Sequence, residues 1–136
     1  MENNKFIIFC DGGSRGNPGP AGLGAVIYDD KKNILAELYE YLGETTNNQA
    51  EYRAVLAAIK KAKELNGQEL DFYLDSELIV KQMSGEYRVK NKDLLPIFME
   101  IRKYSLEFKS VHFSHVPREQ NTEADALANR AMDEHS

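Results

Sequence analysis

The stretch KFIIFCDGG, residues 5–13, places an unbroken apolar run directly before an aspartate and two glycines. Residues 6–10 are all apolar, which is typical of a strand that is buried on both faces. The carboxylate that follows, Asp11, is costly to place at the edge of a core unless a cation or hydrogen-bond donors meet it. The stretch therefore predicts a central strand that ends either in a turn or at a metal site.

Size and composition restrict the class of protein. The 136 residues suffice for a single domain, residues 1–136, whose core needs no disulfides. The single cysteine, Cys10, lies in the apolar run and is interpreted as a buried hydrophobic residue in a reducing compartment. No apolar stretch reaches membrane-spanning length, and the start, MENNK, does not resemble a secretory signal. We therefore expect a soluble, cytoplasmic protein without membrane contact.

Charge is unevenly distributed along the chain. The formal net charge is −5, which argues against loose binding of polyanions, because affinity for phosphate normally depends on an excess of Lys and Arg. Residues 81–92 are an exception, since they contain Lys81, Arg88, Lys90 and Lys92 but only Glu86 among the acids. Taken alone, this stretch is interpreted as a solvated surface.

Short apolar segments divide the rest of the chain into strands and helices. Further strands are expected at residues 23–30, 33–43, 69–75 and 110–116, and helices at residues 47–65, 76–83, 92–108 and from 122 onward. The order βββαβααβα predicts an α/β fold with a mixed five-stranded sheet, three antiparallel strands and then parallel strands, flanked by helices. Sites in such sheets lie at the carboxyl ends of the strands, where both Asp11 and Asp75 stand. If the first and fourth strands are parallel neighbours, these two carboxylates lie side by side.

The glycine-rich segment that follows the first strand does not match a cofactor loop. It lacks the glycine spacing of a dinucleotide-binding loop, and a strand follows it where that motif needs a helix. It also lacks the Gly-Lys-Ser/Thr ending of a nucleotide-phosphate loop. Two interpretations stay open: a wide hairpin turn, or a surface on which main-chain N–H groups meet an extended ligand.

Four carboxylates are candidates for chemistry, and each also has an ordinary interpretation. They are Asp11, Glu51, Asp75 and Asp125. Asp11 could be a turn residue, and the other three lie where helix-capping residues are common. Glu51, for example, is three residues after Asn48, while Thr46 and Gln49 form an alternative capping pair.

Taken together, the four carboxylates favour a metal site. Two strand ends and two helix starts place them near one rim of the sheet, where they would repel and raise one another's pKa unless cations neutralised them. Oxygen ligands favour Mg²⁺ or Mn²⁺. Two such ions about 4 Å apart can activate water and stabilise the leaving oxygen in phosphodiester cleavage. Such ions would also allow an acidic protein to bind a polyanion.

Five motifs in this order resemble type 1 ribonuclease H, over nearly the whole chain. They are DGGSRGNPGPAG (11–22), TTNNQAE (45–51), LDSELIVKQ (74–82), VKN (89–91) and HVPREQNTEADALAN (115–129). The resemblance implies the ribonuclease H-like fold and endonucleolytic cleavage of the RNA strand of RNA–DNA hybrids with Mg²⁺ or Mn²⁺. The resemblance is to a short form of the family. Many members carry a basic, Trp-rich protrusion, but the corresponding segment here is only SGEYRVKNK (84–92), and the chain has no tryptophan.

The resemblance also assigns roles to individual residues. It makes the acidic quartet, Asp11, Glu51, Asp75 and Asp125, the catalytic metal ligands, and it makes His115 a catalytic residue that assists protonation or product release. Contacts to RNA fall on Gly12, Gly13, Ser14, Arg15, Gly16, Asn17, Asn47 and Asn48, whose polar groups suit 2′-hydroxyls. Contacts to DNA phosphates fall on Thr46 and Asn91. Because Asn91 belongs to the basic segment, residues 81–92 would contact the phosphates along the nucleic-acid backbone. Arg118 is expected in the same loop as His115, where it would contact the substrate and could do similar electrostatic work, although His115 is the preferred candidate for the catalytic role.

Departures from the family pattern predict weak binding. Glu77 stands where the family often has glutamine, and Glu44 stands where some members have a phosphate-binding arginine. In place of the protrusion, Tyr87 and Arg88 are the nearest substitutes. We therefore expect low affinity for hybrids and strong salt dependence. Separately, we expect the protein to be a monomer. Two alternatives stay open: a metal nuclease of the same fold that acts on double-stranded RNA or branched DNA, and a non-catalytic nucleic-acid-binding module.

Overall fold

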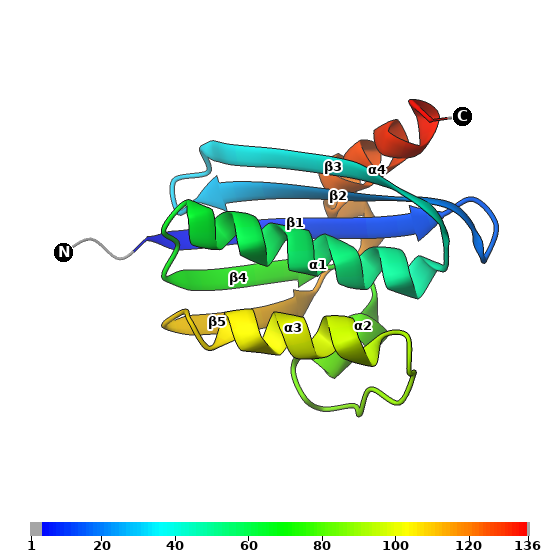
Figure 1. Cartoon of the computed structure of the whole chain (residues 1–136). Coiled ribbons are helices and arrows are strands. Elements are labelled where there is room, and N and C mark those ends of the chain that lie inside the picture. The colour runs from blue at the N-terminus through cyan, green and yellow to red at the C-terminus, as the bar shows by residue number, and fades with distance from the viewer. Residues whose placement is uncertain (1–3, 136) are drawn as a thin grey trace.

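A computed structural model describes residues 4–135 and has the expected order of elements (Figure 1). The strands are β1 (Lys5–Ser14), β2 (Gly19–Asp29), β3 (Ile34–Thr45), β4 (Glu69–Leu74) and β5 (Ser110–His115). The helices are α1 (Asn47–Glu64), α2 (Glu77–Met83), α3 (Leu95–Ser105) and α4 (Thr122–Asp133), with a 3₁₀ turn η1 (Arg118–Gln120) before α4. The predicted α/β class and the order βββαβααβα are confirmed.

The five strands form one mixed sheet in the order β3-β2-β1-β4-β5. The first three strands pair antiparallel, while β1 pairs parallel with β4, and β4 pairs parallel with β5. The apolar run of β1 is therefore central, as predicted from its unbroken apolar character. In the register of β1 and β4, Phe9 lies opposite Tyr73, so the chain places Asp11 and Asp75 the same two residues further on.

Helices cover both faces of the sheet (Figure 1). The helices α1 and α3 lie over one face and α4 lies over the other. Alternate residues of β1, Phe6, Ile8 and Cys10, are buried in the main core with α1. The intervening residues of β1, Asp11 among them, are half-buried and point to the opposite face.

The glycine-rich segment is mostly strand, which corrects the predicted loop. β1 continues to Ser14 and β2 begins at Gly19, so only residues 15–18 form the hairpin tip. Glycines in these strands stand where helices approach the sheet closely. A Cβ on Gly12 would collide with the α1 backbone at Ala50, and a Cβ on Gly24 would collide with the α4 backbone at Ala124.

Local hydrogen bonds explain where α1, α2 and α3 begin. Thr46 caps α1 by accepting a hydrogen bond from the N–H of Gln49, and Ser76 caps α2 by accepting one from Ile79. At the end of α1, Asn66 adopts a positive φ of 63°, a conformation that asparagine tolerates. Helix α3 begins at Leu95 instead of residue 92, because Asn91 accepts hydrogen bonds from the N–H groups of residues 93 and 94 and holds a turn there. It ends at Ser105, before the predicted residue 108.

None of the helices within residues 4–135 is both long enough and apolar enough to cross a membrane.

Candidate active site

Two carboxylates stand at the ends of neighbouring parallel strands. Asp11 belongs to the last part of β1, and Asp75 directly follows β4. Both side chains are half-buried. Parallel pairing of β1 with β4 brings the two carboxylates to the same edge of the sheet, as expected if the first and fourth strands are parallel neighbours.

Two further carboxylates reach this edge from helices on opposite faces. Glu51 lies in the first turns of α1, whose backbone at residues 50–51 packs against Gly12. Asp125 lies in the first turn of α4, whose backbone packs against Gly24. Gly24 lies opposite Asp11 in the β1–β2 pair. The two glycines next to Asp11 and across from it therefore allow both helices to come within reach of its carboxylate.

Burial and the neighbouring acids raise the pKa values of Asp11 and Glu51. Burial, followed by the charge of Asp75 and by hydrogen bonding to Asp125, raises the pKa of Asp11 to about 8. Burial and the charge of Asp75 raise the pKa of Glu51 to about 7. A cluster of this kind stores repulsion in the folded protein, and a bound cation would relieve it.

The donor set suits a hard divalent ion that is shared with a substrate. Within residues 4–135, no three Asp, Glu, His or Cys side chains are grouped tightly enough to hold a metal ion by themselves. Mg²⁺ commonly binds only one or two carboxylates, keeps several waters and takes further ligands from substrate phosphates. The clustered carboxylates therefore suit an ion that keeps waters and substrate phosphates among its ligands better than they suit an ion enclosed entirely by protein side chains.

Asn121 supports the site, and the sequence interpretation missed it. This residue is 1% exposed, and its Nδ2 group donates to the carbonyl of Cys10 at 2.8 Å and to Asp75 Oδ2 at 3.0 Å. It therefore ties the residue before α4 to both strand ends. Its position just before Thr122 marks a helix start, but the residue to which its side chain bonds could not be read from the sequence.

A polar groove of about 640 Å³ lies beside the start of α1 and gathers four of the predicted substrate contacts. Asn17, Thr46, Asn48 and Asn91 all line it. Arg53 lines the same groove, although the sequence interpretation did not single it out. Thr46, Gln49 and Arg53 have the i, i+3, i+7 spacing of one helix face, which is the signal that could have identified Arg53.

The side chains of the predicted RNA-contacting segment make contacts within the protein. Asn47 Oδ1 accepts hydrogen bonds from the Ser14 N–H at 2.7 Å and from its hydroxyl at 3.0 Å. Asn17 Oδ1 accepts from the Asn47 N–H at 3.1 Å. These bonds hold the hairpin tip against the start of α1. Gly13 lies in β1 and Gly16 has a positive φ of 94° in the tip.

His115 and Arg118 lie at the exposed border of the site. His115 is the last residue of β5, where it pairs opposite Leu74, and does not lie in the loop that follows. Arg118 begins η1, and its charge acts to lower the pKa of Glu51, against the larger effect of burial. Both side chains are exposed.

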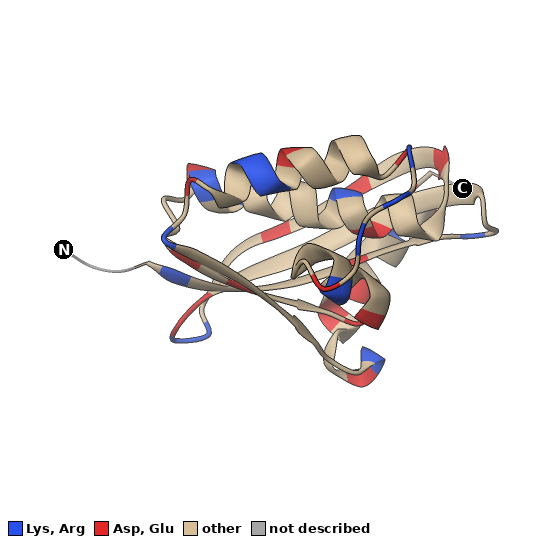
Figure 2. Ribbon diagram, turned by 90° about the horizontal axis from the view of Figure 1, so that it is seen from below, with Lys and Arg blue, Asp and Glu red and all other residues tan. Residues whose placement is uncertain are grey.

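The basic segment is partly neutralised. Lys81 forms an ion pair with Glu77 at 3.0 Å and a hydrogen bond to the Tyr87 hydroxyl at 3.3 Å. Glu77 therefore does not add an unopposed negative charge. Arg88, Lys90 and Lys92 are exposed, and all three lie on the connection between α2 and α3. This connection carries basic segments in Figure 2.

Comparison with known proteins identifies the class to which this fold and site belong. A family model described as reverse transcriptase-like matches residues 9–131. The bifunctional protein Rv2228c of Mycobacterium tuberculosis is 46% identical over 130 residues, which are 95% of this chain and 36% of that protein. Ribonuclease HI of Halobacterium salinarum is 40% identical over 130 residues, which are 96% of this chain and 65% of that protein. The chain thus spans about a third to two thirds of the length of these relatives.

A solved structure agrees with these sequence matches. The crystal structure of LC11-RNase H1 in complex with an RNA/DNA hybrid aligns with a TM-score of 0.91 and 45% identity, and the alignment covers 96% of this chain and 98% of that one. The chain belongs to the reverse transcriptase-like family, and within it to the type 1 ribonucleases H.

Proposed function

We propose that this protein is an endoribonuclease that hydrolyses the RNA strand of RNA–DNA hybrids with two Mg²⁺ or Mn²⁺ ions. The observation that carries the proposal is the meeting of Asp11, Glu51, Asp75 and Asp125 at one edge of the sheet. Further support comes from LC11-RNase H1, a protein of 45% identity whose complex contains an RNA/DNA hybrid.

The four carboxylates would hold the ions and position the reacting groups. When bound, the two ions would supply an activated water and stabilise the departing 3′ oxygen. Asp11 and Asp75, fixed at the ends of adjacent strands, would be ligands of the ions. Glu51 and Asp125 approach from opposite faces and would orient the water and the phosphate. His115, exposed at the end of β5, would give a proton to the departing oxygen or assist product release.

The polar groove would bind the phosphates of the DNA strand. The Thr46 hydroxyl accepts the capping bond from Gln49, so its own proton is available to donate to a phosphate. Asn91 uses its Oδ1 in the turn, so a phosphate contact would come from its Nδ2 group. Arg53 would supply the cationic donor that Glu44 cannot.

Contacts to ribose would distinguish RNA from DNA. Asn48 and the main chain of the Gly12–Asn17 segment stand beside the groove and the carboxylates, where they can donate to or accept from 2′-hydroxyls. Arg88, Lys90 and Lys92 would follow the nucleic-acid backbone outside the site. With a net charge of −5, the protein would bind hybrids weakly and with a strong dependence on salt.

A direct assay tests this function. Labelled RNA–DNA hybrid, double-stranded RNA, branched DNA and DNA duplex are incubated separately with Mg²⁺, with Mn²⁺ or with EDTA. We expect cleavage of the RNA strand of the hybrid only, abolished by EDTA and in Asp75→Asn. Cleavage of double-stranded RNA or branched DNA would redirect the proposal to those substrates. Hybrid binding without cleavage would indicate a binding module.

The proposal includes a monomer that works in the cytoplasm. All four carboxylates come from one chain, so the site needs no second copy. Light scattering measures the mass in solution, and a dimer whose dissociation abolished activity would contradict this part. Fluorescent tagging of the protein in its host cell tests the location.

A further inference from the structure

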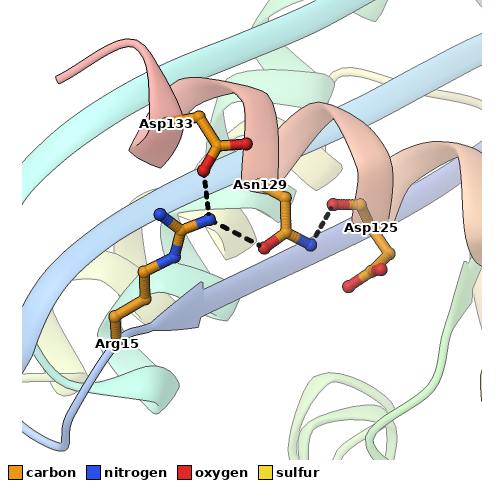
Figure 3. A network of polar contacts seen from close by, with 4 residues as sticks. All are labelled: Arg15, Asp125, Asn129 and Asp133. Atoms are coloured by element: carbon orange, nitrogen blue, oxygen red, sulfur yellow. Dashed lines mark hydrogen bonds and ion pairs between the residues drawn. The ribbon is translucent and has the colours of Figure 1, made fainter. Parts of the chain in front are cut away.

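Arg15, at the tip of the β1–β2 hairpin, contacts the helix that carries Asp125 (Figure 3). Its Nη2 atom lies 2.6 Å from Asp133 Oδ1 and donates to Asn129 Oδ1 at 3.3 Å. Asn129 in turn donates from Nδ2 to the main-chain carbonyl of Asp125 at 3.0 Å. The guanidinium of Arg15 is thereby linked to the first turn of α4 in two steps.

These contacts lie along one face of α4. Asp125, Asn129 and Asp133 follow one another at intervals of four residues, which places them on the same side of a helix. Figure 3 shows their side chains on the side of α4 that Arg15 reaches. The face that meets Arg15 is therefore continuous with the face that presents the Asp125 carboxylate.

The same hairpin is also bound to α1. Ser14 and Asn17, on either side of Arg15 in the sequence, form hydrogen bonds with Asn47 at the start of that helix. The hairpin tip thus connects α1 on one face of the sheet with α4 on the other. Each of these helices carries one of the proposed metal ligands, Glu51 or Asp125.

Helix α4 packs against β2 through small residues. Its buried residues are mainly alanines, Ala124, Ala128 and Ala131, and they rest on the glycine-containing surface of β2. Asn121 holds the start of α4 through two hydrogen bonds, and Arg15 adds directed polar contacts further along the helix.

We propose that Arg15 is a positioning residue that fixes α4, and with it Asp125, relative to the strand that carries Asp11. The inference deepens the proposed nuclease function and rests on it. It differs from the role of RNA contact that the family resemblance gives to Arg15, because the guanidinium is directed to α4 and its Nη2 group donates there.

Steady-state kinetics on the hybrid separate positioning from substrate contact. Loss of a partly exposed charge network of this size is expected to lower the rate of turnover by about fivefold. For Arg15→Ala, Asn129→Ala and Asp133→Asn, we expect kcat to fall about fivefold while KM changes less than about twofold. Because Arg15 and Asp133 act as one unit, the double variant should match Arg15→Ala instead of multiplying the losses.

Matched variants exclude a general effect on folding or charge. Arg102→Ala removes an exposed arginine that packs on Phe98 in α3, and we expect wild-type kinetics from it. Arg15→Lys keeps the charge for Asp133 but loses the planar fork that reaches two partners, so we expect partial rescue of kcat. Circular dichroism melts verify that each variant is folded at the assay temperature.

Calorimetric titration with Mn²⁺ in the absence of nucleic acid gives a readout that does not need turnover. We expect Arg15→Ala to bind Mn²⁺ about two- to fivefold more weakly than wild type, because Asp125 is less well placed. An increase in KM at unchanged kcat, or multiplied losses in the double variant, would overturn the proposal. Unchanged Mn²⁺ affinity and kcat would do the same. If wild type failed to cleave hybrid, the proposed function would fail, while the Mn²⁺ titration would still test Arg15.

Discussion

Replacing Asp11 with asparagine should stabilise the metal-free protein. Burial and the neighbouring acids raise the pKa of Asp11 from 3.8 to about 8 in the folded state. The folded protein therefore binds more protons than the unfolded chain between about pH 4 and pH 8, so its free energy of unfolding falls as the pH rises through this range. An asparagine side chain at this position would keep a similar shape without the charge.

The size of the effect follows from this shift. Each pKa unit corresponds to about 1.4 kcal/mol, so a shift from 3.8 to about 8 sets an upper bound of about 6 kcal/mol above pH 8. Asp11 is only half-buried, and its interaction is shared with Asp75 and Asp125, so relief of one charge recovers part of this amount. We expect about 2 kcal/mol at pH 8.5, which is about 7 °C in Tm for a chain of 136 residues.

Thermal unfolding in EDTA, measured from pH 4 to pH 9, tests this value. The gain of Asp11→Asn should be absent near pH 4, should grow with pH, and should shrink or reverse in millimolar Mg²⁺, which would stabilise the wild type selectively. Asp29→Asn is the matched control: hydrogen bonds from Asn33 lower the pKa of Asp29, so this variant should be destabilised at neutral pH. A variant at Asp11 that is no more stable than wild type at pH 8.5, or a gain independent of pH, would refute the reasoning.

Three further predictions concern packing, the buried amide and the groove. Gly24→Ala should lower the free energy of unfolding by about 2–3 kcal/mol in urea, because its Cβ would press on the α4 backbone; an unchanged midpoint would contradict the close approach. Asn121→Ala should cost about 2–3 kcal/mol and reduce kcat, since Cys10 and Asp75 lose a shared donor; wild-type kcat would contradict this support. Arg53→Ala should raise KM for the hybrid about three- to tenfold at unchanged kcat and reduce the salt slope by about one; an unchanged slope would exclude a phosphate contact.

The order and pairing of the strands could be predicted because they depend on local patterns. The apolar run before Asp11 marks a central strand, and short links between the first three strands require antiparallel pairing. A helical crossover to the strand that precedes Asp75 makes this strand part of a mixed sheet, in which β1 is one candidate for its parallel neighbour. Asp11 and Asp75 then meet at one edge of the sheet on the condition that β1 and β4 are neighbours, and the structure shows that they are.

The contacts between distant segments could not be predicted in this way. The glycines near Asp11 look like a loop because their reason is the approach of two helices, which composition does not reveal. Asn121 and Arg15 bond to groups far away in the sequence. Of these residues, only Arg53 could have been identified from the sequence, by its helical spacing from Thr46.

The buried face of α4 is rich in alanine, and this affects the order in which the protein would unfold and lose activity. Because this helix buries small side chains, detaching it exposes far less apolar surface than opening the core between the sheet and α1. Sub-global opening of the C-terminal segment should therefore precede collapse of the sheet as denaturant is added. Such a species would retain most of its ellipticity yet lack one of the four acids, so nuclease turnover would vanish while the spectroscopic signal still reported a native molecule.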